Sequence, residues 1–138
     1  MKGINKTKKN AKKSSIPKRE ILSWFEIPVL NLERGMAFYS SVLETSFETT
    51  QTATHAMAFF SAESGVNGAL VFGDGCVPSI TGSLLYFNVA SNLEQILLKV
   101  QDFGGQVLMG KTLISEDVGF YSLILDSEGN RIALNSKN

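Results

Sequence analysis

The chain of 138 residues contains a single histidine and a single cysteine, and this scarcity excludes several kinds of chemistry. Cys76 has no partner for a disulfide within the chain, so nothing in the cysteine content indicates an oxidising compartment. His55 alone cannot form a two-histidine metal site, and no serine or cysteine has a histidine close in sequence to activate it. We therefore expect no serine or thiol nucleophile, and we expect His55 to be a surface loop residue.

Long apolar runs are also missing. The longest, such as residues 83–89, are strand-sized and far short of the roughly 20 residues that cross a bilayer. The basic N-terminus is not followed by the apolar segment of a secretory signal. Gly73-Asp74-Gly75 lacks the Lys-Ser/Thr pair of a phosphate-binding loop. These absences predict a cytoplasmic protein with no membrane partner.

The net charge of zero conceals two oppositely charged parts. Residues 1–20 contain eight basic residues and one acidic residue, a net charge of +7, and residues 21–138 carry the compensating −7. The first 20 residues are rich in Lys, Asn and Ser and lack an apolar face, so we expect a disordered basic tail. The acidic remainder would repel phosphate, so we do not expect nucleic acid to bind the folded part.

Residues 21–138 show two rounds of the same element order. Residues 21–29 and 83–89 are rich in β-branched and aromatic residues and predict strands, and Pro28 indicates that the first strand lies at a sheet edge or ends near there. Asn31 caps the first predicted helix; Ser91 or Asn92 caps the second, which Gly104-Gly105 ends. Further extended segments are predicted at residues 48–52, 56–62, 68–72, 106–109, 119–125 and 131–135.

The repeat predicts an α+β fold of two tandem β-α-β-β-β modules, residues 21–74 and 82–136, within a single domain of residues 21–138. Residues 63–65 before Gly68-Ala69-Leu70 correspond to residues 127–129 before Ile132-Ala133-Leu134. Each module buries one sheet face under its helix and leaves the other as an open, cup-like surface. Two such modules enclose a cleft of the kind in which small molecules bind.

Several motifs resemble the vicinal-oxygen-chelate superfamily of glyoxalases, bleomycin-resistance proteins and dioxygenases. They are residues 25–29 (FEIPV), 32–34, 38–43 (FYSSVL), 82–87, 104–107 and 126–132 (DSEGNRI). The resemblance covers about residues 21–136 and implies paired modules and a homodimer. The family holds a divalent metal through residues of the first and last strand of each module. Those positions fall on Trp24, on Leu84, on Ala133 and on or within a residue of Ala69. These residues offer no metal ligand, so we expect neither metal nor other cofactor.

Strand alternation selects the side chains that would face the cleft. Glu26 stands among apolar neighbours, where burial would keep its carboxyl protonated and suited to proton transfer. The alternative is a structural carboxylate that is satisfied by backbone N–H groups, by an arginine such as Arg131 or by Tyr86. Trp24, Phe72 and Tyr86 form either a stacking platform for a planar ligand or part of the core. Asn88 would orient a ligand, and Arg131 faces the same side. Asp126 and Glu128 belong to a turn and are expected to face solvent.

Three functions are compatible with this pattern. The first is non-catalytic binding of a small molecule in the cleft, with Trp24, Phe72, Tyr86, Asn88 and Arg131 as ligand-binding residues. The second is a metal-independent lyase or isomerase that uses Glu26 as its acid/base. The third is an interaction or regulatory module in which the basic tail or a sheet edge meets a partner. The sequence identifies neither the ligand nor a reaction.

Overall fold

The computed structural model describes residues 18–138, and most of the predicted basic tail lies outside this range. Residues 18–20, its last three, are exposed. The order of elements is β1 (Trp24–Pro28), α2 (Leu32–Leu43), β2 (Phe47–Gln51), β3 (His55–Phe60), β4 (Asn67–Gly73), β5 (Tyr86–Asn88), α3 (Leu93–Asp102), β6 (Gln106–Ser115), β7 (Gly119–Leu125) and β8 (Arg131–Ser136).

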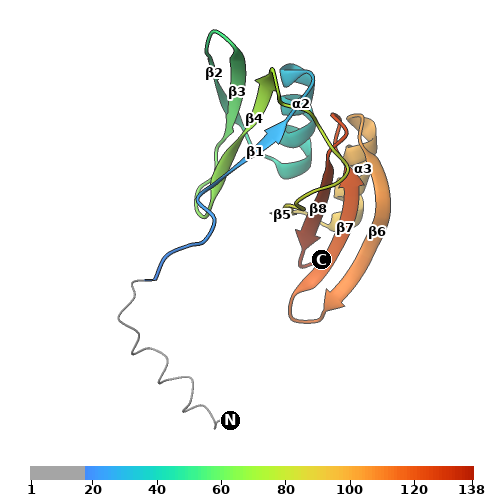
Figure 1. Cartoon of the computed structure of the whole chain (residues 1–138). Helices are drawn as coiled ribbons and strands as arrows, with labels where there is room; N and C mark the ends of the chain where they lie inside the picture. Colours follow the sequence, from blue (N-terminus) through green and yellow to red (C-terminus); the bar gives the residue numbers. More distant parts are fainter. Residues whose placement is uncertain (1–17) are drawn as a thin grey trace.

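The elements form two β-α-β-β-β modules, which confirms the predicted fold. The N-terminal sheet has the strand order β1-β4-β3-β2 and the C-terminal sheet the order β5-β8-β7-β6. In both sheets the first strand of the module pairs in parallel with the last, and the other pairs are antiparallel. Pro28 lies on an edge strand, as predicted. The modules lie side by side, and residues 74–85 connect them (Figure 1).

Local sequence signals set the bounds of both helices. The Asn31 side chain accepts a hydrogen bond from the Arg34 N–H at 2.9 Å and caps α2, as expected. Asn92, rather than Ser91, caps α3 through the Glu94 N–H. Gly104 follows the end of α3 with φ +94°, a conformation that side chains other than glycine rarely adopt. In both helices the buried residues recur every three or four positions, so each turns one apolar stripe to the core.

Several strands differ from their predicted extents. β1 and β5 are shorter than the apolar runs that contain them, because neighbouring strands pair with only part of each run. Residues before β5 still lie beside β8, since the Ala133 N–H donates to the Leu85 carbonyl at 2.9 Å. β6 runs to Ser115, six residues beyond its predicted end, through several register shifts against β7. His55 begins β3 instead of lying in the preceding loop.

A single hydrophobic core joins the two modules. Both helices contribute to it, together with the helix-facing side chains of both sheets, and α2 and α3 lie next to each other (Figure 1). An aromatic cluster lies at the junction, where the Phe87 ring centroid is 5.5 Å from that of Phe25 and 5.9 Å from that of Phe60. The core members include Ile27, Val29, Phe38, Tyr39, Val42, Leu70, Leu93, Ile96, Val100, Ile124, Ile132 and Leu134. The modules therefore share one buried interior.

A polar cluster holds the β7–β8 turn against the first module, and we call it the junction network: Arg34, Tyr39, Asp126, Glu128 and Asn130. The Glu128 carboxylate accepts hydrogen bonds from the backbone N–H of Leu30 and Asn31 at 2.9 Å and forms an ion pair with Arg34 at 2.7 Å. Tyr39 donates to Asp126 at 2.5 Å, and Asn130 donates to the Pro28 carbonyl at 2.8 Å. The prediction that Asp126 and Glu128 face solvent is wrong.

The exposure of this pair explains the correction. Asp126 is 2% exposed and Glu128 5% exposed, because their partners come from a segment more than eighty residues earlier in the chain. Burial alone would raise the pKa of Glu128. The hydrogen bonds from Arg34, Ser127, Leu30 and Asn31 outweigh it and lower the pKa to about 2. Burial, followed by the charge and hydrogen bond of Asp126, raises the pKa of the Tyr39 hydroxyl well above its usual value.

We predict that Glu128→Gln lowers the free energy of unfolding at neutral pH by about 2–4 kcal/mol, because it removes a charged acceptor from two backbone N–H groups and Arg34. A folded-state pKa of about 2 lies below the ordinary 4.5, so the stabilisation is present above pH 4.5 and is lost as pH falls towards 2. Urea unfolding at a series of pH values should show this acid-dependent component in the wild type and not in the variant. Glu33→Gln, on the exposed surface of α2, is the control; equal losses in both variants would contradict the role of Glu128.

Candidate functional site

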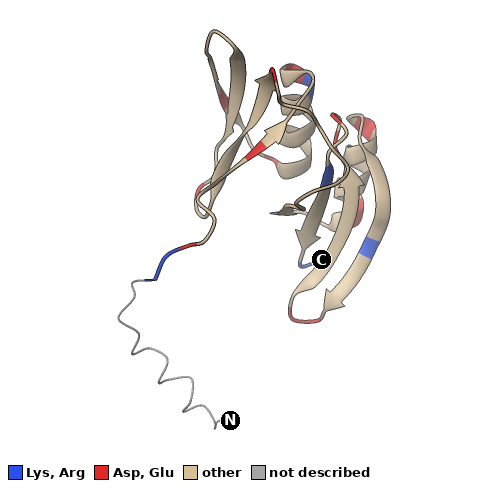
Figure 2. Ribbon diagram, in the orientation of Figure 1, with Lys and Arg blue, Asp and Glu red and all other residues tan. Residues whose placement is uncertain are grey.

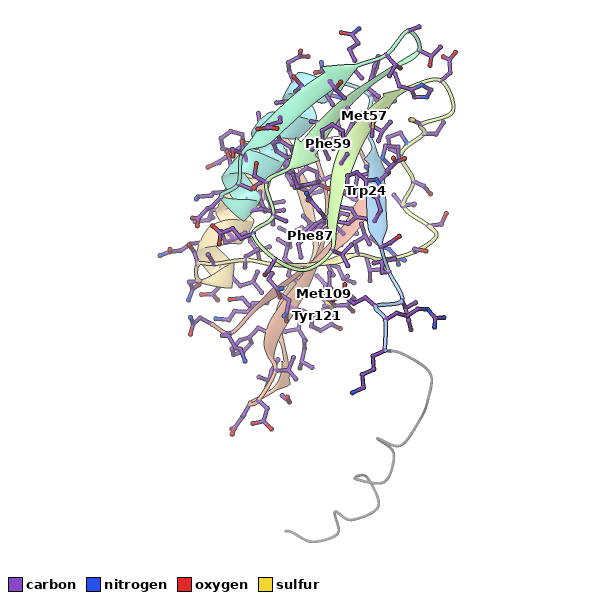
Figure 3. The ribbon with its side chains drawn as sticks, turned by 90° about the vertical axis from the view of Figure 1, so that its left-hand side faces the viewer. Trp24, Met57, Phe59, Phe87, Met109 and Tyr121 are labelled. Atoms are coloured by element: carbon purple, nitrogen blue, oxygen red, sulfur yellow. The ribbon has the colours of Figure 1, made fainter. Side chains whose placement is uncertain are left out.

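Each sheet has one face covered by its helix and one that we call the open face. In β3, Ala58 and Phe60 are buried under α2, so Met57 and Phe59 lie on the open face. Trp24 lies on the same face, with its ring centroid 5.9 Å from that of Phe59. On the C-terminal sheet the open face carries Tyr86 stacked on Tyr121 at 6.1 Å. Figure 3 labels Trp24, Met57, Phe59, Met109 and Tyr121 on these two sheets.

A cavity of about 550 Å³ lies where the two modules meet, and we call it the junction pocket. Its size is in the range of pockets that hold small organic ligands. One wall is the β3–β4 turn with the start of β4, the other is β5 with the two leucines before it, and the aromatic cluster lies at its base. The lining residues are Leu22, Phe25, Leu43, Thr45, Phe60, Ala62, Ser64, Gly65, Val66, Asn67, Leu84, Leu85, Tyr86, Phe87 and Asn88.

The polar groups of the junction pocket are few and neutral. No charged side chain is among the described residues that line it. The Asn67 Oδ1 atom is buried and accepts no hydrogen bond, and a buried acceptor without a partner costs about 1–3 kcal/mol. Asn88 Oδ1, in contrast, already accepts a hydrogen bond from Asn135 at 3.2 Å. The pocket is therefore an apolar space with one unsatisfied acceptor at its edge.

The internal repeat explains why this space is open. Ala69 pairs with Glu26 in the first module as Ala133 pairs with Tyr86 in the second, so the β3–β4 turn corresponds to the β7–β8 turn. Gly65 and Gly129 have matching φ values of +78° and +100°. Ser64 then stands where the second module has Glu128, and Val66 stands where it has Asn130. Ser64 and Val66 cannot form the hydrogen bonds and the ion pair of the junction network. The space between the modules therefore stays open at this end and forms the junction pocket.

The residues predicted to bind a ligand lie in different places. Tyr86 and Asn88 line the junction pocket, while Trp24 lies outside it on the open face of the N-terminal sheet. Phe72 is in alternation with the buried Leu70, so it lies on the helix side, in a groove with Leu32 and Met36. The structure therefore does not bring Trp24, Phe72 and Tyr86 together as one platform. Arg131 lies at the start of β8, beside the loop that precedes β5.

Glu26 does not have the environment predicted for it. Its side chain is exposed rather than buried, because it lies on the open face of an edge strand. It accepts a hydrogen bond from Trp24 Nε1 at 3.2 Å. It is also absent from the residues that line the junction pocket. The apolar surroundings that favoured an acid/base role are not present, and the role itself stays a prediction.

The sequence analysis matched residues 63–65 with residues 127–129 but assigned no site role to this turn, to Asn67 or to the rings of Phe25 and Phe60. The signal for the turn was that Ser64 and Val66 interrupt a pattern that Glu128 and Asn130 complete. The aromatic rings face the pocket through the same strand face that packs on the helices. Alternation alone assigns that face to the core, so it gave no signal of a cavity.

The positions at which the superfamily holds its metal do not fit one here. Trp24, Ala69, Leu84 and Ala133 have no imidazole, carboxylate or thiolate. Among residues 18–138, no three histidine, cysteine, aspartate or glutamate side chains gather at a common point. His55 instead contacts the Thr54 hydroxyl at 2.8 Å and the Asp74 carbonyl at 3.2 Å. The expectation that the protein has no metal centre stays a prediction.

Solved structures share this fold at low sequence identity. A glyoxalase/bleomycin resistance protein/dioxygenase domain from Frankia sp. matches with a TM-score of 0.68 and 15% identity, over 88% of this chain and 100% of that one. The fosfomycin resistance protein FosX from Listeria monocytogenes matches with a TM-score of 0.64 and 13% identity, over 86% and 92%. Glyoxalase I from Zea mays matches with a TM-score of 0.63 and 14% identity, over 84% of this chain and 46% of that one. This chain therefore spans about half the length of that enzyme.

These likenesses confirm that the chain has the two-module fold of the vicinal-oxygen-chelate superfamily. No family model matches the sequence, and no curated protein is similar to it in sequence. Within the described part of the chain, neither helix is long and apolar enough to cross a membrane. Figure 2 shows acidic residues on both modules and few basic ones, as the charge of residues 21–138 indicates.

We predict that Glu26→Gln leaves the free energy of unfolding unchanged within about 0.5 kcal/mol, because the side chain is exposed and the amide oxygen can still accept from Trp24. Thermal unfolding of the variant and the wild type would check this. A loss above about 1 kcal/mol would show that Glu26 is a structural carboxylate after all. With stability unchanged, any effect of the variant on binding or turnover reports directly on function.

Proposed function

We propose that the protein binds a small organic molecule in the junction pocket. The observation that carries this proposal is the cavity of about 550 Å³ with aromatic rings at its base and one buried, unpartnered acceptor, Asn67 Oδ1. Such a site favours a neutral molecule with an apolar, planar body, because no charged group is available to compensate an ion. A hydroxyl or amine on that body would donate to Asn67.

The alternative of a lyase or isomerase that uses Glu26 has less support. Its proton-transfer group lies on the open face and lines neither the junction pocket nor the cavity of about 360 Å³ beside Trp24 and Phe59. An interaction module would use a sheet edge or the basic tail, and most of the tail lies outside the described range. We therefore favour non-catalytic binding, without a nucleic-acid partner, over both.

Filling the pocket should abolish binding without unfolding the protein. Val66 lines the pocket and lies in a turn, so Val66→Trp places a large ring in the cavity without displacing a strand. Val77→Trp makes the same change at a side chain that is 72% exposed and outside the junction pocket. Some fragments of a small-molecule library should raise the melting temperature of the wild type. We predict that the same fragments also raise the melting temperature of Val77→Trp, and that they bind Val66→Trp with at least tenfold lower affinity.

A second variant tests the hydrogen bond separately. Asn67→Leu keeps the size of the side chain and removes the unpartnered acceptor. It should therefore lower the affinity for fragments that carry a hydrogen-bond donor and leave the affinity for purely apolar fragments unchanged. Isothermal titration of both fragment classes would measure the difference. Unchanged binding to Val66→Trp would place the ligand elsewhere and contradict the proposal.

We also propose that two copies of the chain associate through their open faces. Trp24, at 39% exposed, and Tyr86, at 55% exposed, leave aromatic surface uncovered on both sheets, and exposed apolar surface of this kind marks interaction sites. Light scattering at micromolar concentration should give the mass of a dimer. Met57→Lys places a charge on the open face of the N-terminal sheet and should shift the mass to a monomer. A wild-type monomer under these conditions would contradict the proposal.

A further inference from the structure

Arg131 has a buried donor without an acceptor. Its Nε atom makes no hydrogen bond, although the atom is shielded from solvent. Within residues 18–138 the guanidinium also forms no ion pair, in contrast to Arg34, which is bound to Glu128. A guanidinium presents several N–H donors in a fixed plane that suits the oxygens of carboxylates and phosphates. The chain thus holds an oxyanion-binding group that none of its own carboxylates occupies.

Arg131 lines a small pocket beside the loop that leads into β5, and we call it the loop pocket. It has a volume of about 100 Å³, and the loop contributes three hydroxyl side chains to it, those of Ser79, Thr81 and Ser83. All three of these loop residues are exposed, so the pocket opens to solvent. No aspartate or glutamate is among the described residues that line it. The rest of the lining is Asn130 and the apolar residues Ile27, Pro28, Val77, Leu85 and Ile132, so the guanidinium and the hydroxyls stand on an otherwise apolar wall with no carboxylate beside them.

The wall of the loop pocket is fixed in place by the rest of the fold. The Ser79 N–H donates to Asn130 Oδ1 at 3.1 Å, and the Arg131 N–H donates to the Ser79 carbonyl at 3.3 Å. Asn130 itself belongs to the junction network. The Ser79 hydroxyl accepts from the Thr81 N–H at 3.0 Å and also lies 3.0 Å from the Thr81 hydroxyl, so these two hydroxyls contact each other and shape the loop. The donors are therefore held before any ligand arrives, which reduces the entropy cost of binding.

The internal repeat relates this pocket to the junction pocket. Asn67 and Arg131 are the first residues of the last strands of the two modules, and both carry a buried polar atom without a partner. Each lines the pocket at its own end of the module junction. The first is an acceptor in a large apolar cavity, and the second is a donor in a small pocket lined by both polar and apolar residues. The two ends therefore differ in the charge of the ligand that each suits.

We propose that the loop pocket is a second binding site, specific for a phosphate-sized oxyanion, in which Arg131 and the hydroxyls of Ser79, Thr81 and Ser83 hold the anion. The volume of about 100 Å³ admits an inorganic phosphate or the phosphate group of a monoester and is too small for a drug-sized molecule. The bound anion would connect β8 to the loop from 79 to 83. The site is separate from the junction pocket and does not depend on a ligand there.

The test is thermal unfolding of the full chain in increasing phosphate, with sodium chloride adjusted to keep the ionic strength constant. We expect a saturable rise in melting temperature of about 5 °C when phosphate exceeds its Kd tenfold. Phenyl phosphate is tested on the wild-type protein in parallel, to distinguish a free anion from the phosphate group of a larger ligand. A lower Kd for phenyl phosphate than for inorganic phosphate identifies the larger ligand, and equal Kd values identify the free anion. A wild type with no saturable response to either would overturn the proposal.

Three variants assign the response to the loop pocket. Arg131→Gln should abolish it, and Lys111→Gln, which removes one positive charge from β6 outside this pocket, should keep it. Ser83→Asp places a carboxylate in the pocket and should lose the phosphate response while Arg131 is intact, so the test stands even if Arg131→Gln does not fold. The basic residues 1–20 are present in every variant, so their effect is common to all. A phosphate response of wild-type size in Ser83→Asp would overturn the proposal.

Discussion

The contact between Glu128 and the start of α2 fixes how the two modules meet. One carboxylate accepts from two consecutive backbone N–H groups, those of Leu30 and Asn31, and pairs with Arg34. The N–H groups at the start of a helix have no partner within the helix, so a buried start requires an acceptor from elsewhere. Here the acceptor comes from the other module. The shared core, the approach of the two helices and the position of the β7–β8 turn all depend on this contact.

The same constraint accounts for the pocket. A duplicated unit would place equivalent contacts at both ends of the junction, but only one end has the residues to make them. Glu44 supplies a weaker connection between the modules elsewhere, through Ser91 at 3.2 Å and Lys99 at 3.6 Å, and these side chains are exposed. With Ser64 and Val66 in the β3–β4 turn, that end of the junction remains unfilled. Divergence of two turns thus gives one end of the junction a structural role and leaves the other free for a ligand.

Most of the fold could be predicted from the sequence, because its signals are local. Asn31 as a helix cap, Gly104 after α3 and the alternation of β1 are each read from a few neighbouring residues. The site could be predicted only in part. Tyr86 and Asn88 line the junction pocket, and their role in binding a ligand stays a prediction. Phe72 lies on the helix side of its sheet, because its face follows from the packing of Leu70 on α2.

The predictions that were wrong concern residues whose surroundings depend on contacts between distant parts of the chain. Glu128 lies in a turn whose composition is typical of solvent-exposed loops, and its partners are separated from it by more than ninety residues. Glu26 lies among apolar neighbours in sequence, yet its edge strand and open face expose it. The unpartnered atoms of Asn67 and Arg131 have no sequence signature, because a missing hydrogen bond is a property of the folded surroundings. These are the residues on which the functional proposals depend.

The most direct test of the account is to map where small organic molecules contact the protein. Backbone amide shifts of the isotope-labelled chain, recorded with a library of neutral aromatic fragments, would report every contact site at once. We expect binding fragments to shift the amides of residues 62–67 and 84–88, on the two walls of the junction pocket. Shifts confined to the open faces, around Trp24, Met57 and Phe59 or around Tyr121, would contradict it and place the ligand between the two sheets of a closed cup instead.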